Sequence, residues 1–209
     1  MRRLPALVRT GLAALLLGGA AASAQAGNQQ YEPLAASVQA ALHAAVADQA
    51  PLDPSFQRSP ERARWLAEMS QRLAKRIPDE TARSELLRAV HYEATRAGLD
   101  PQLVLGLIQV ESGFKKYALS PVGARGYMQV MPFWARLIGN QETNLFHMRT
   151  NLRFGCTILR HYLDIEKGDL FRALGRYNGS LGRAEYPNMV RAAWERNWAY
   201  APLRLASNP

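Results

Sequence analysis

The chain has 209 residues, 48% of them hydrophobic, which is enough apolar material for one well-formed core. Its formal net charge of +9 suits a partner that carries carboxylates or phosphates. Because the sequence shows no zinc-finger spacing, Arg-Gly repeat or aromatic RNA-binding signature, we predict no nucleic-acid partner.

The first 24 residues have the composition of a secretory signal. Arginines at positions 2 and 3 give a basic start, residues 11–21 are apolar, and Ala22-Ser23-Ala24 is a small-residue cleavage site. We predict cleavage after this site, and cleavage after Ala26 fits as well. The apolar stretch is short and rich in glycine, so an uncleaved anchor is the weaker interpretation. We therefore expect an exported protein, periplasmic or secreted, with no transmembrane segment after cleavage.

Beyond the signal, helical periodicity accounts for every regular segment. The predicted helices span residues 34–46, 61–77, 82–97, 101–111, 132–139, 148–167, 170–177 and 187–199. No stretch alternates as a strand does, and no internal repeat is present. The predicted fold class is therefore all-α, with at most a small irregular hairpin in the loop after residue 111.

The fourth predicted helix ends in a single carboxylate. Asp100 is a good N-cap and Pro101 suits the first helical position. Val104 and Ile108 lie on the same face as Glu111, at helical spacing. Apolar surroundings and the negative end of the helix both raise the pKa of a glutamate, as a general acid requires near neutral pH. A solvated helix-ending glutamate is the commoner alternative.

Three sequence blocks occur in order along the second half of the chain. They are Glu111-Ser112, then Ala118-x-Ser120-x-x-Gly123-Ala124-x-Gly126-x-Met128-Gln129-x-Met131-Pro132, then Tyr177-Asn178. Together they closely resemble the soluble lytic murein transglycosylase catalytic domain, a family of the lysozyme-like superfamily. The resemblance covers about residues 90–200. It implies a lysozyme-like helical domain with an irregular active-site loop, preceded by N-terminal helices.

The resemblance also implies a reaction. Members of the family cleave the β-1,4 bond between N-acetylmuramic acid and N-acetylglucosamine in peptidoglycan without adding water. The muramic acid 6-hydroxyl closes on its own anomeric carbon and leaves a 1,6-anhydro end. Glu111 stands at the position of the glutamate that performs both proton transfers. The substrate's own N-acetyl group is thought to stabilise the positive charge, an exception to the two-carboxylate rule.

The sequence agrees with one carboxylate, because the matched blocks after Glu111 contain no other acidic residue. The nearest acid downstream, Glu142, is better interpreted as a solvated surface residue. A distant partner carboxylate stays open at this stage. So do two other functions, a muramidase that uses water and a non-catalytic peptidoglycan-binding protein of the cell envelope.

The resemblance assigns substrate contacts to five residues, Ser120, Met128, Gln129, Tyr177 and Asn178. The serine and the glutamine would hold the sugar and its N-acetyl group, and the methionine would line the cleft. The tyrosine would lie beside the catalytic glutamate, and the asparagine would close the same corner. Taken singly, each is also an ordinary turn or core residue. The chain departs from the family at Arg176, where a small residue is usual, which implies either different local packing there or a cation at the rim of the cleft.

The remaining reactive side chains predict structure rather than chemistry. Cys156 is the only cysteine, so no internal disulfide can form, and its place on an apolar helical stripe predicts burial. The four histidines lack ligand spacing, so we predict no metal and no cofactor. Peptidoglycan strands are the expected partner, and an envelope protein partner stays open.

We divide the chain into four parts. These are a signal peptide (1–24), an N-terminal helical extension (25–80), a catalytic domain (81–200) and a C-terminal tail (201–209). The N-terminal helices can pack on the catalytic domain, shape its cleft or bind a partner, and the sequence does not choose among these roles.

Overall fold

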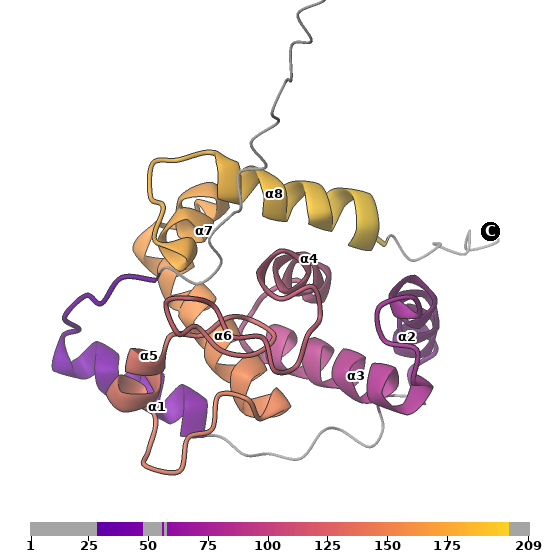
Figure 1. The fold of residues 1–209 in the computed structure, drawn as a ribbon, viewed down its shortest axis with the longest axis horizontal. Helices are drawn as coiled ribbons and strands as arrows, with labels where there is room; N and C mark the ends of the chain where they lie inside the picture. Colours follow the sequence, from indigo (N-terminus) through magenta and orange to yellow (C-terminus); the bar gives the residue numbers. More distant parts are fainter. Residues whose placement is uncertain (1–28, 48–55, 57, 201–209) are drawn as a thin grey trace, which may run out of the picture.

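The computed structural model describes residues 29–47, 56 and 58–200. These residues form an all-α fold, as predicted (Figure 1). The elements are α1 (Ala36–Ala47), α2 (Pro60–Leu73), α3 (Glu80–Arg96), α4 (Pro101–Glu111), α5 (Pro132–Ile138), α6 (Met148–Ile165), α7 (Leu170–Asn178), α8 (Glu185–Ala193) and the π-helical turn η2 (Trp194–Trp198). The signal at 1–24 and the tail at 201–209 lie outside the described residues.

Helix α4 occupies the centre of the domain. It packs against α3, α8 and η2, and Figure 1 shows it surrounded by these elements. Side chains on all of its faces are buried, with Leu103, Val104, Leu105, Leu107 and Ile108 each no more than 5% exposed. A helix that is apolar all round belongs in the interior. Whatever side chain ends this helix is therefore carried into the core.

The predicted start of α4 is confirmed in atomic detail. The Asp100 carboxylate accepts a hydrogen bond from the Gln102 amide at 2.7 Å, and Pro101 fills the first helical position. The helix ends at Glu111, and Gly113 follows with a φ of +58°. That left-handed conformation favours glycine and turns the chain out of the helix.

The last predicted helix is wrong in detail. It begins at Glu185, two residues before the predicted start, and its final turn widens into the π-helical η2. The wider turn places Trp198 in the core, where its indole N–H donates to the Gln109 side chain at 2.9 Å. A periodicity argument counts 3.6 residues per turn, so it does not detect this local change.

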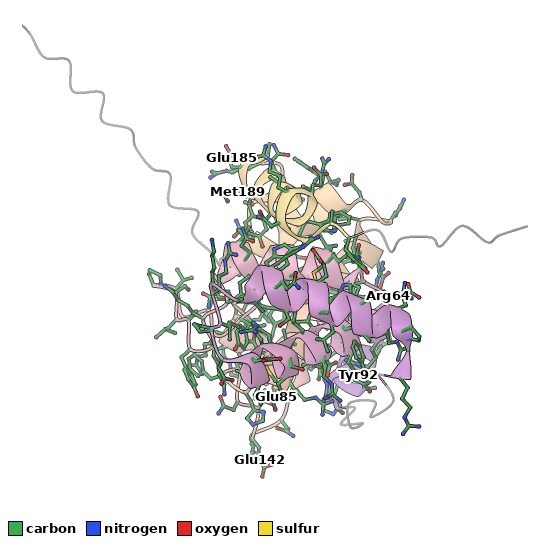
Figure 2. The ribbon with its side chains drawn as sticks, turned by 90° about the vertical axis from the view of Figure 1, so that its right-hand side faces the viewer. Arg64, Glu85, Tyr92, Glu142, Glu185 and Met189 are labelled. Carbon is green, nitrogen blue, oxygen red and sulfur yellow. The ribbon has the colours of Figure 1, made fainter. Side chains whose placement is uncertain are left out.

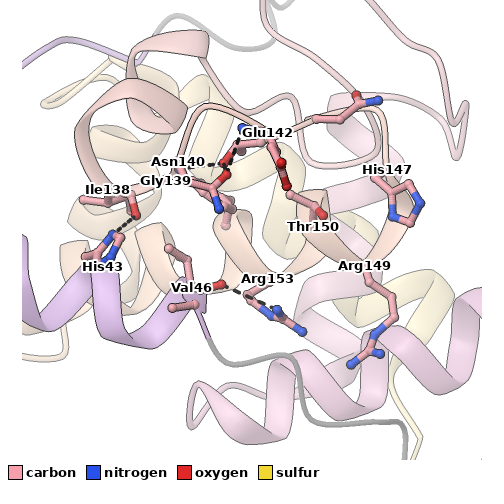
Figure 3. Close-up of a pocket in the computed structure, with 14 residues that line it drawn as sticks. His43, Val46, Ile138, Gly139, Asn140, Glu142, His147, Arg149, Thr150 and Arg153 are labelled. Atoms are coloured by element: carbon pink, nitrogen blue, oxygen red, sulfur yellow. Dashed lines mark hydrogen bonds between the residues drawn. The ribbon is translucent and has the colours of Figure 1, made fainter.

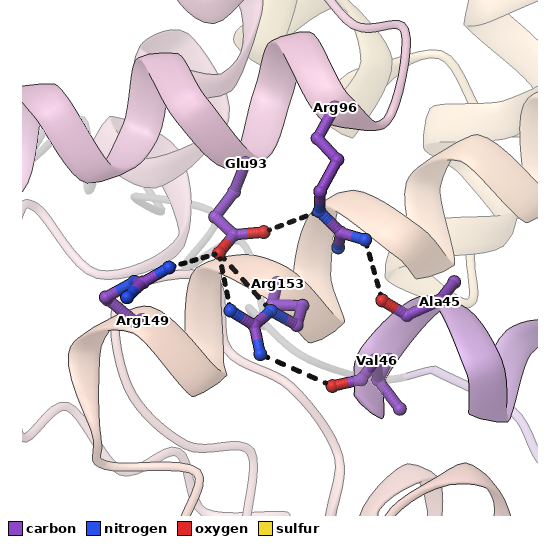
Figure 4. A network of polar contacts seen from close by, with 6 residues as sticks. All are labelled: Ala45, Val46, Glu93, Arg96, Arg149 and Arg153. Carbon is purple, nitrogen blue, oxygen red and sulfur yellow. Dashed lines mark hydrogen bonds and ion pairs between the residues drawn. The ribbon is translucent and has the colours of Figure 1, made fainter. Parts of the chain in front are cut away.

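Both N-terminal helices pack on the rest of the molecule. Helix α2 lies against α3 and η2, and α1 lies against α5 and α6. Hydrogen bonds fix α1, as Figure 4 shows: Arg96 and Arg153 donate to the carbonyls of Ala45 and Val46 in its last turn, at 2.7 and 3.5 Å. Both arginines are held by Glu93 of α3, which is fully buried. Among the roles left open by the sequence, packing on the domain is therefore observed.

Two surface predictions can also be checked. Cys156 is buried, as its helical stripe predicts, and burial raises the pKa of its thiol. Glu142 is exposed at the edge of the molecule (Figure 2), as expected of a solvated acid. In the described part of the chain, no helix is both long and apolar enough to cross a bilayer.

Candidate active site

The loop between α4 and α5 forms one wall of the candidate site. Isolated antiparallel bridges join Arg125 to Leu119 and to Val130, so the small irregular hairpin allowed by the sequence is present. Gly126 has a φ of +74°, and a Cβ there would lie 2.5 Å from the Asn151 side chain. Glycine is therefore required twice, by backbone conformation and by space.

Asn151 of α6 anchors this loop. Its side chain is buried, accepts from the Met128 amide at 2.8 Å, and donates to the carbonyls of Arg125 and Leu145 at 2.7 and 2.8 Å. A buried amide that makes all of these bonds fixes an irregular backbone, since every polar group inside must be paired. Sequence reasoning missed Asn151, because nothing in the helix pattern distinguishes it from a surface asparagine.

Met128 is fully buried against α6. A Cβ on Gly155 would lie 2.4 Å from its sulfur, so the glycine leaves the space that the methionine fills. Its side chain has the core-filling role that the sequence left open. The Met128 carbonyl accepts a hydrogen bond from the Tyr177 phenol at 2.7 Å.

Gln129 and Ser120 support the loop in the free protein. Gln129 has a φ of +48°, an uncommon conformation for a residue other than glycine. Its side-chain amide donates to the carbonyls of Ala118 and Gly126 at 3.2 and 3.0 Å, which holds that conformation in place. The Ser120 hydroxyl accepts from the Ala124 amide at 3.0 Å. That these two residues also contact sugar stays a prediction.

Glu111 lies at the centre of the site and is only 6% exposed. Burial raises the pKa of its carboxyl to about 8, and a hydrogen bond from the Tyr186 phenol to Oε1 partly opposes this rise. The other oxygen, Oε2, is buried without a hydrogen-bond partner. At neutral pH the side chain is therefore mostly a neutral acid, which is the state a proton donor needs.

Tyr186 is the tyrosine that holds the carboxylate, and sequence reasoning missed it. The phenol of the predicted Tyr177 instead donates to the Met128 carbonyl. Tyr177 nevertheless lies close enough to Glu111 for the carboxylate to raise its pKa, after burial the second cause of the shift. Tyr186 comes from the first turn of α8, 75 residues after Glu111, and only the fold brings the two together.

The C-terminal end of α7 holds Asn178 and Arg176. The Asn178 amide donates to the Ser180 hydroxyl at 3.1 Å, while its Oδ1 is buried without a partner. Arg176 is half-buried and forms ion pairs with Glu166 and, at 3.0 Å, with Glu32 of the N-terminal segment. Both partners of Arg176 are thus acids of this chain, and a position at the rim of the cleft stays a prediction.

No second carboxylate acts on Glu111 among the described residues. Its pKa shift has two causes, burial and the Tyr186 bond, and neither is another acid. The same part of the chain holds no cluster of three or more histidine, cysteine or acidic side chains that could bind a metal.

A polar cavity of about 380 Å³ lies elsewhere, between α1, the start of α6 and the loop after α5 (Figure 3). His43, Glu142, His147 and Arg149 are among its lining residues, and it includes none of the residues predicted for the site. The site around Glu111 is therefore separate from this cavity.

Comparison with known families agrees with the arrangement around Glu111. Residues 88–195, just over half of the chain, match the family model described as the transglycosylase SLT domain. The chain belongs to this family. The matched SLT region runs from within α3 into η2 and includes Glu111, the α4–α5 loop, Tyr177 and Tyr186.

Curated relatives of the SLT region are known from a phage and from bacteria. The transglycosylase of Enterobacteria phage PRD1 is 40% identical over 88 residues, which are 42% of this chain and 32% of that protein. Membrane-bound lytic murein transglycosylase C of Histophilus somni (strain 2336) is 45% identical over 112 residues, 46% of this chain and 31% of the relative. The chain spans about a third of the length of these relatives.

Proposed function

We propose that this protein is a peptidoglycan lytic transglycosylase. It would cleave the β-1,4 bond between N-acetylmuramic acid and N-acetylglucosamine and leave a 1,6-anhydromuramic acid end. The main supporting observation is Glu111, a buried carboxyl with a pKa of about 8 inside an SLT domain, on which no other carboxylate of the described residues acts. Relatives named lytic murein transglycosylases support the substrate class.

In the proposed mechanism Glu111 acts twice. The neutral carboxyl first gives its proton to the glycosidic oxygen, and that oxygen leaves with the N-acetylglucosamine unit. The substrate's N-acetyl group stabilises the charge at the anomeric carbon. The carboxylate then removes the proton of the muramic acid 6-hydroxyl, whose oxygen forms the new bond to the anomeric carbon. Glu111 ends protonated, as it began, and no water is consumed.

The local geometry suits this role. Because the Tyr186 bond occupies Oε1, it fixes the plane of the carboxyl and leaves Oε2 as the oxygen without a protein partner. A buried polar atom without a hydrogen-bond partner costs free energy, so a substrate hydroxyl or glycosidic oxygen would be a favourable partner for Oε2. We assign Oε2 to the proton transfers. Ser120, Met128, Gln129, Tyr177 and Asn178 are proposed to shape the sugar-binding surface.

The decisive experiment digests purified sacculi with wild-type protein and with Glu111→Gln, followed by mass spectrometry of the soluble products. We expect anhydro-ended muropeptides from the wild type and a loss of more than about 100-fold in rate for the variant. Glu142→Gln changes an exposed glutamate and is the matched control. Reducing ends would indicate a muramidase, and equal clearance by wild type and Glu111→Gln would indicate a non-catalytic binding protein.

The location of the protein is part of the proposal. We propose export directed by residues 1–24, with the SLT domain then acting outside the cytoplasm, in the periplasm or after secretion. The excess of basic residues suits a polymer whose stem peptides carry carboxylates. Residues 25–80 are proposed to be an extension of the catalytic domain at 81–200, and its helices α1 and α2 pack on that domain.

A further inference from the structure

Residues 29–34, which precede α1, run along the edge of the molecule from α7 to α1 (Figure 1) and are called the N-terminal strap below. It lies outside the SLT match, which begins at residue 88. The strap nevertheless reaches the predicted site. Gln29 at its beginning is only 4% exposed, although glutamine is seldom buried so completely.

The Gln29 side chain ends among the residues of the candidate site. Its Oε1 accepts a hydrogen bond from the Met131 amide at 3.4 Å. Its amide group also lies close enough to the Tyr177 phenol to lower the pKa of that phenol. The nitrogen, Nε2, is buried without a hydrogen-bond partner of normal geometry. Gln29 thus occupies a polar corner that does not satisfy it completely.

The chemistry of this corner matches that of the proposed substrate. A glutamine side chain ends in a carboxamide on a methylene, and both sugars of peptidoglycan carry an acetamido group of nearly the same shape. Each group offers one carbonyl acceptor and an N–H donor. The Met131 N–H, beside the Tyr177 phenol, can therefore donate to the carbonyl oxygen of either the glutamine side chain or a sugar acetamido group.

We propose that the N-terminal strap is an internal competitor of the glycan, with the Gln29 carboxamide occupying the place of a sugar acetamido group. The inference depends on the proposed function, because it takes the substrate to be an N-acetylated glycan. The strap would leave this position when a sugar acetamido group takes the corner at Met131 and Tyr177.

Leu34 packs against the core and fixes the end of the strap next to α1, whereas the contacts of the residues before it are weak. The bond from the Met131 amide is long, at 3.4 Å. Glu32 is 52% exposed in its ion pair with Arg176, and exposed pairs contribute little. Tyr31 is 61% exposed and touches Phe133 only edge-on, with ring centroids 5.8 Å apart.

The burial of Glu111 gives an independent reason for movement. Its Oε2 is enclosed in the free protein, so a glycosidic oxygen cannot approach it while every neighbouring group stays in place. Gln29 of the strap lies beside the Tyr177 phenol, whose pKa Glu111 also raises, and the strap lies outside the SLT match. Arg176, the departure from the family pattern, forms the outer ion pair of this strap.

Binding to a catalytically inactive background tests the inference directly. In full-length Glu111→Gln protein, titration calorimetry would measure the affinity for a β-1,4-linked N-acetylglucosamine tetramer. Adding Gln29→Ala should strengthen binding by about fivefold, since a closed strap reduces the fraction of protein competent to bind. Glu32→Gln, which weakens only the outer ion pair, should strengthen binding by about twofold. Gln30→Ala changes the exposed neighbour and should leave affinity unchanged.

Opposite results would overturn the inference. Weaker binding by Gln29→Ala would indicate that Gln29 is a sugar ligand. Unchanged affinity in both Gln29→Ala and Glu32→Gln would indicate that the strap does not compete with the glycan. With Glu111 intact, Gln29→Ala should lower KM on sacculi and leave kcat unchanged. These readouts differ from the test of the proposed function, which fails if the wild type releases no anhydro ends, whatever the tetramer affinity.

Discussion

Two buried glutamates lie on neighbouring helices of one core and have opposite surroundings. Glu93 of α3 is fully buried, and Arg96, Arg153 and Arg149 lie 3.0, 3.1 and 3.8 Å from its oxygens (Figure 4). Glu111 of α4 is 6% exposed and has one polar partner, the uncharged Tyr186. The two residues differ in the charges around them far more than in depth.

This difference separates a structural carboxylate, Glu93, from the proposed catalytic acid, Glu111. Three arginines pair with the buried Glu93 and make it a fixed link, here between α1, α3 and α6. A buried carboxyl without a cation favours the neutral form and keeps its proton at neutral pH. Burial alone therefore does not identify an acid catalyst, and the absence of a positive partner is the informative feature. Three substitutions test this contrast.

The largest expected effect is on stability, at Glu93. Glu93→Ala would leave the buried Arg153 guanidinium without its carboxylate and would release the arginines that hold the last turn of α1. We expect the free energy of unfolding to fall by about 3–5 kcal/mol, measured by urea denaturation at pH 7. Glu85→Ala removes an exposed glutamate from the same helix (Figure 2) and is the control. Equal midpoints for the two variants would show that the arginine cluster contributes nothing.

At Glu111 a substitution should raise the free energy of unfolding rather than lower it. The folded carboxyl has a pKa of about 8 against 4.5 for the exposed group, so the native state binds more protons than the unfolded state between these pH values. Wild-type stability therefore falls as pH rises through this window, and Glu111→Gln escapes the loss. We expect the variant to be more stable by about 2–3 kcal/mol at pH 7 and to show no such gain at pH 4. Urea denaturation at both pH values checks this, and a gain that does not change with pH would contradict the raised pKa.

Local rules predicted the elements of this fold and the position of its acid. Asp100 and Pro101 define the start of α4, and Val104 and Ile108 place Glu111 on a buried face. All of these signals lie within one or two helical turns, where spacing determines which side chains share a face. That is why the helix and its buried end were predictable.

Contacts between distant segments were not predictable. Asn151 holds the loop from 23 residues away, and Gln29 reaches Met131 across 102 residues of sequence. A hydrogen bond between segments so far apart leaves no periodic pattern, and each of these residues is an ordinary polar residue when read locally. Family resemblance pointed to Tyr177 but did not provide the tyrosine that bonds to Glu111, which is Tyr186.

Removing that tyrosine's hydroxyl is the finest test of the contrast, because it changes one bond and leaves the burial of Glu111 intact. Tyr186→Phe should lower kcat on sacculi by about tenfold, since the carboxyl loses the bond that orients it. The Tyr186 bond lowers the pKa of Glu111 against the effect of burial, so the variant should retain its proton to higher pH. The alkaline limb of the pH–rate profile should therefore move to higher pH. Tyr92→Phe, in a half-buried tyrosine of α3 next to Arg149, is the control. A purely structural role for Tyr186 would reduce stability and leave the pH profile of the remaining activity where it is in the wild type.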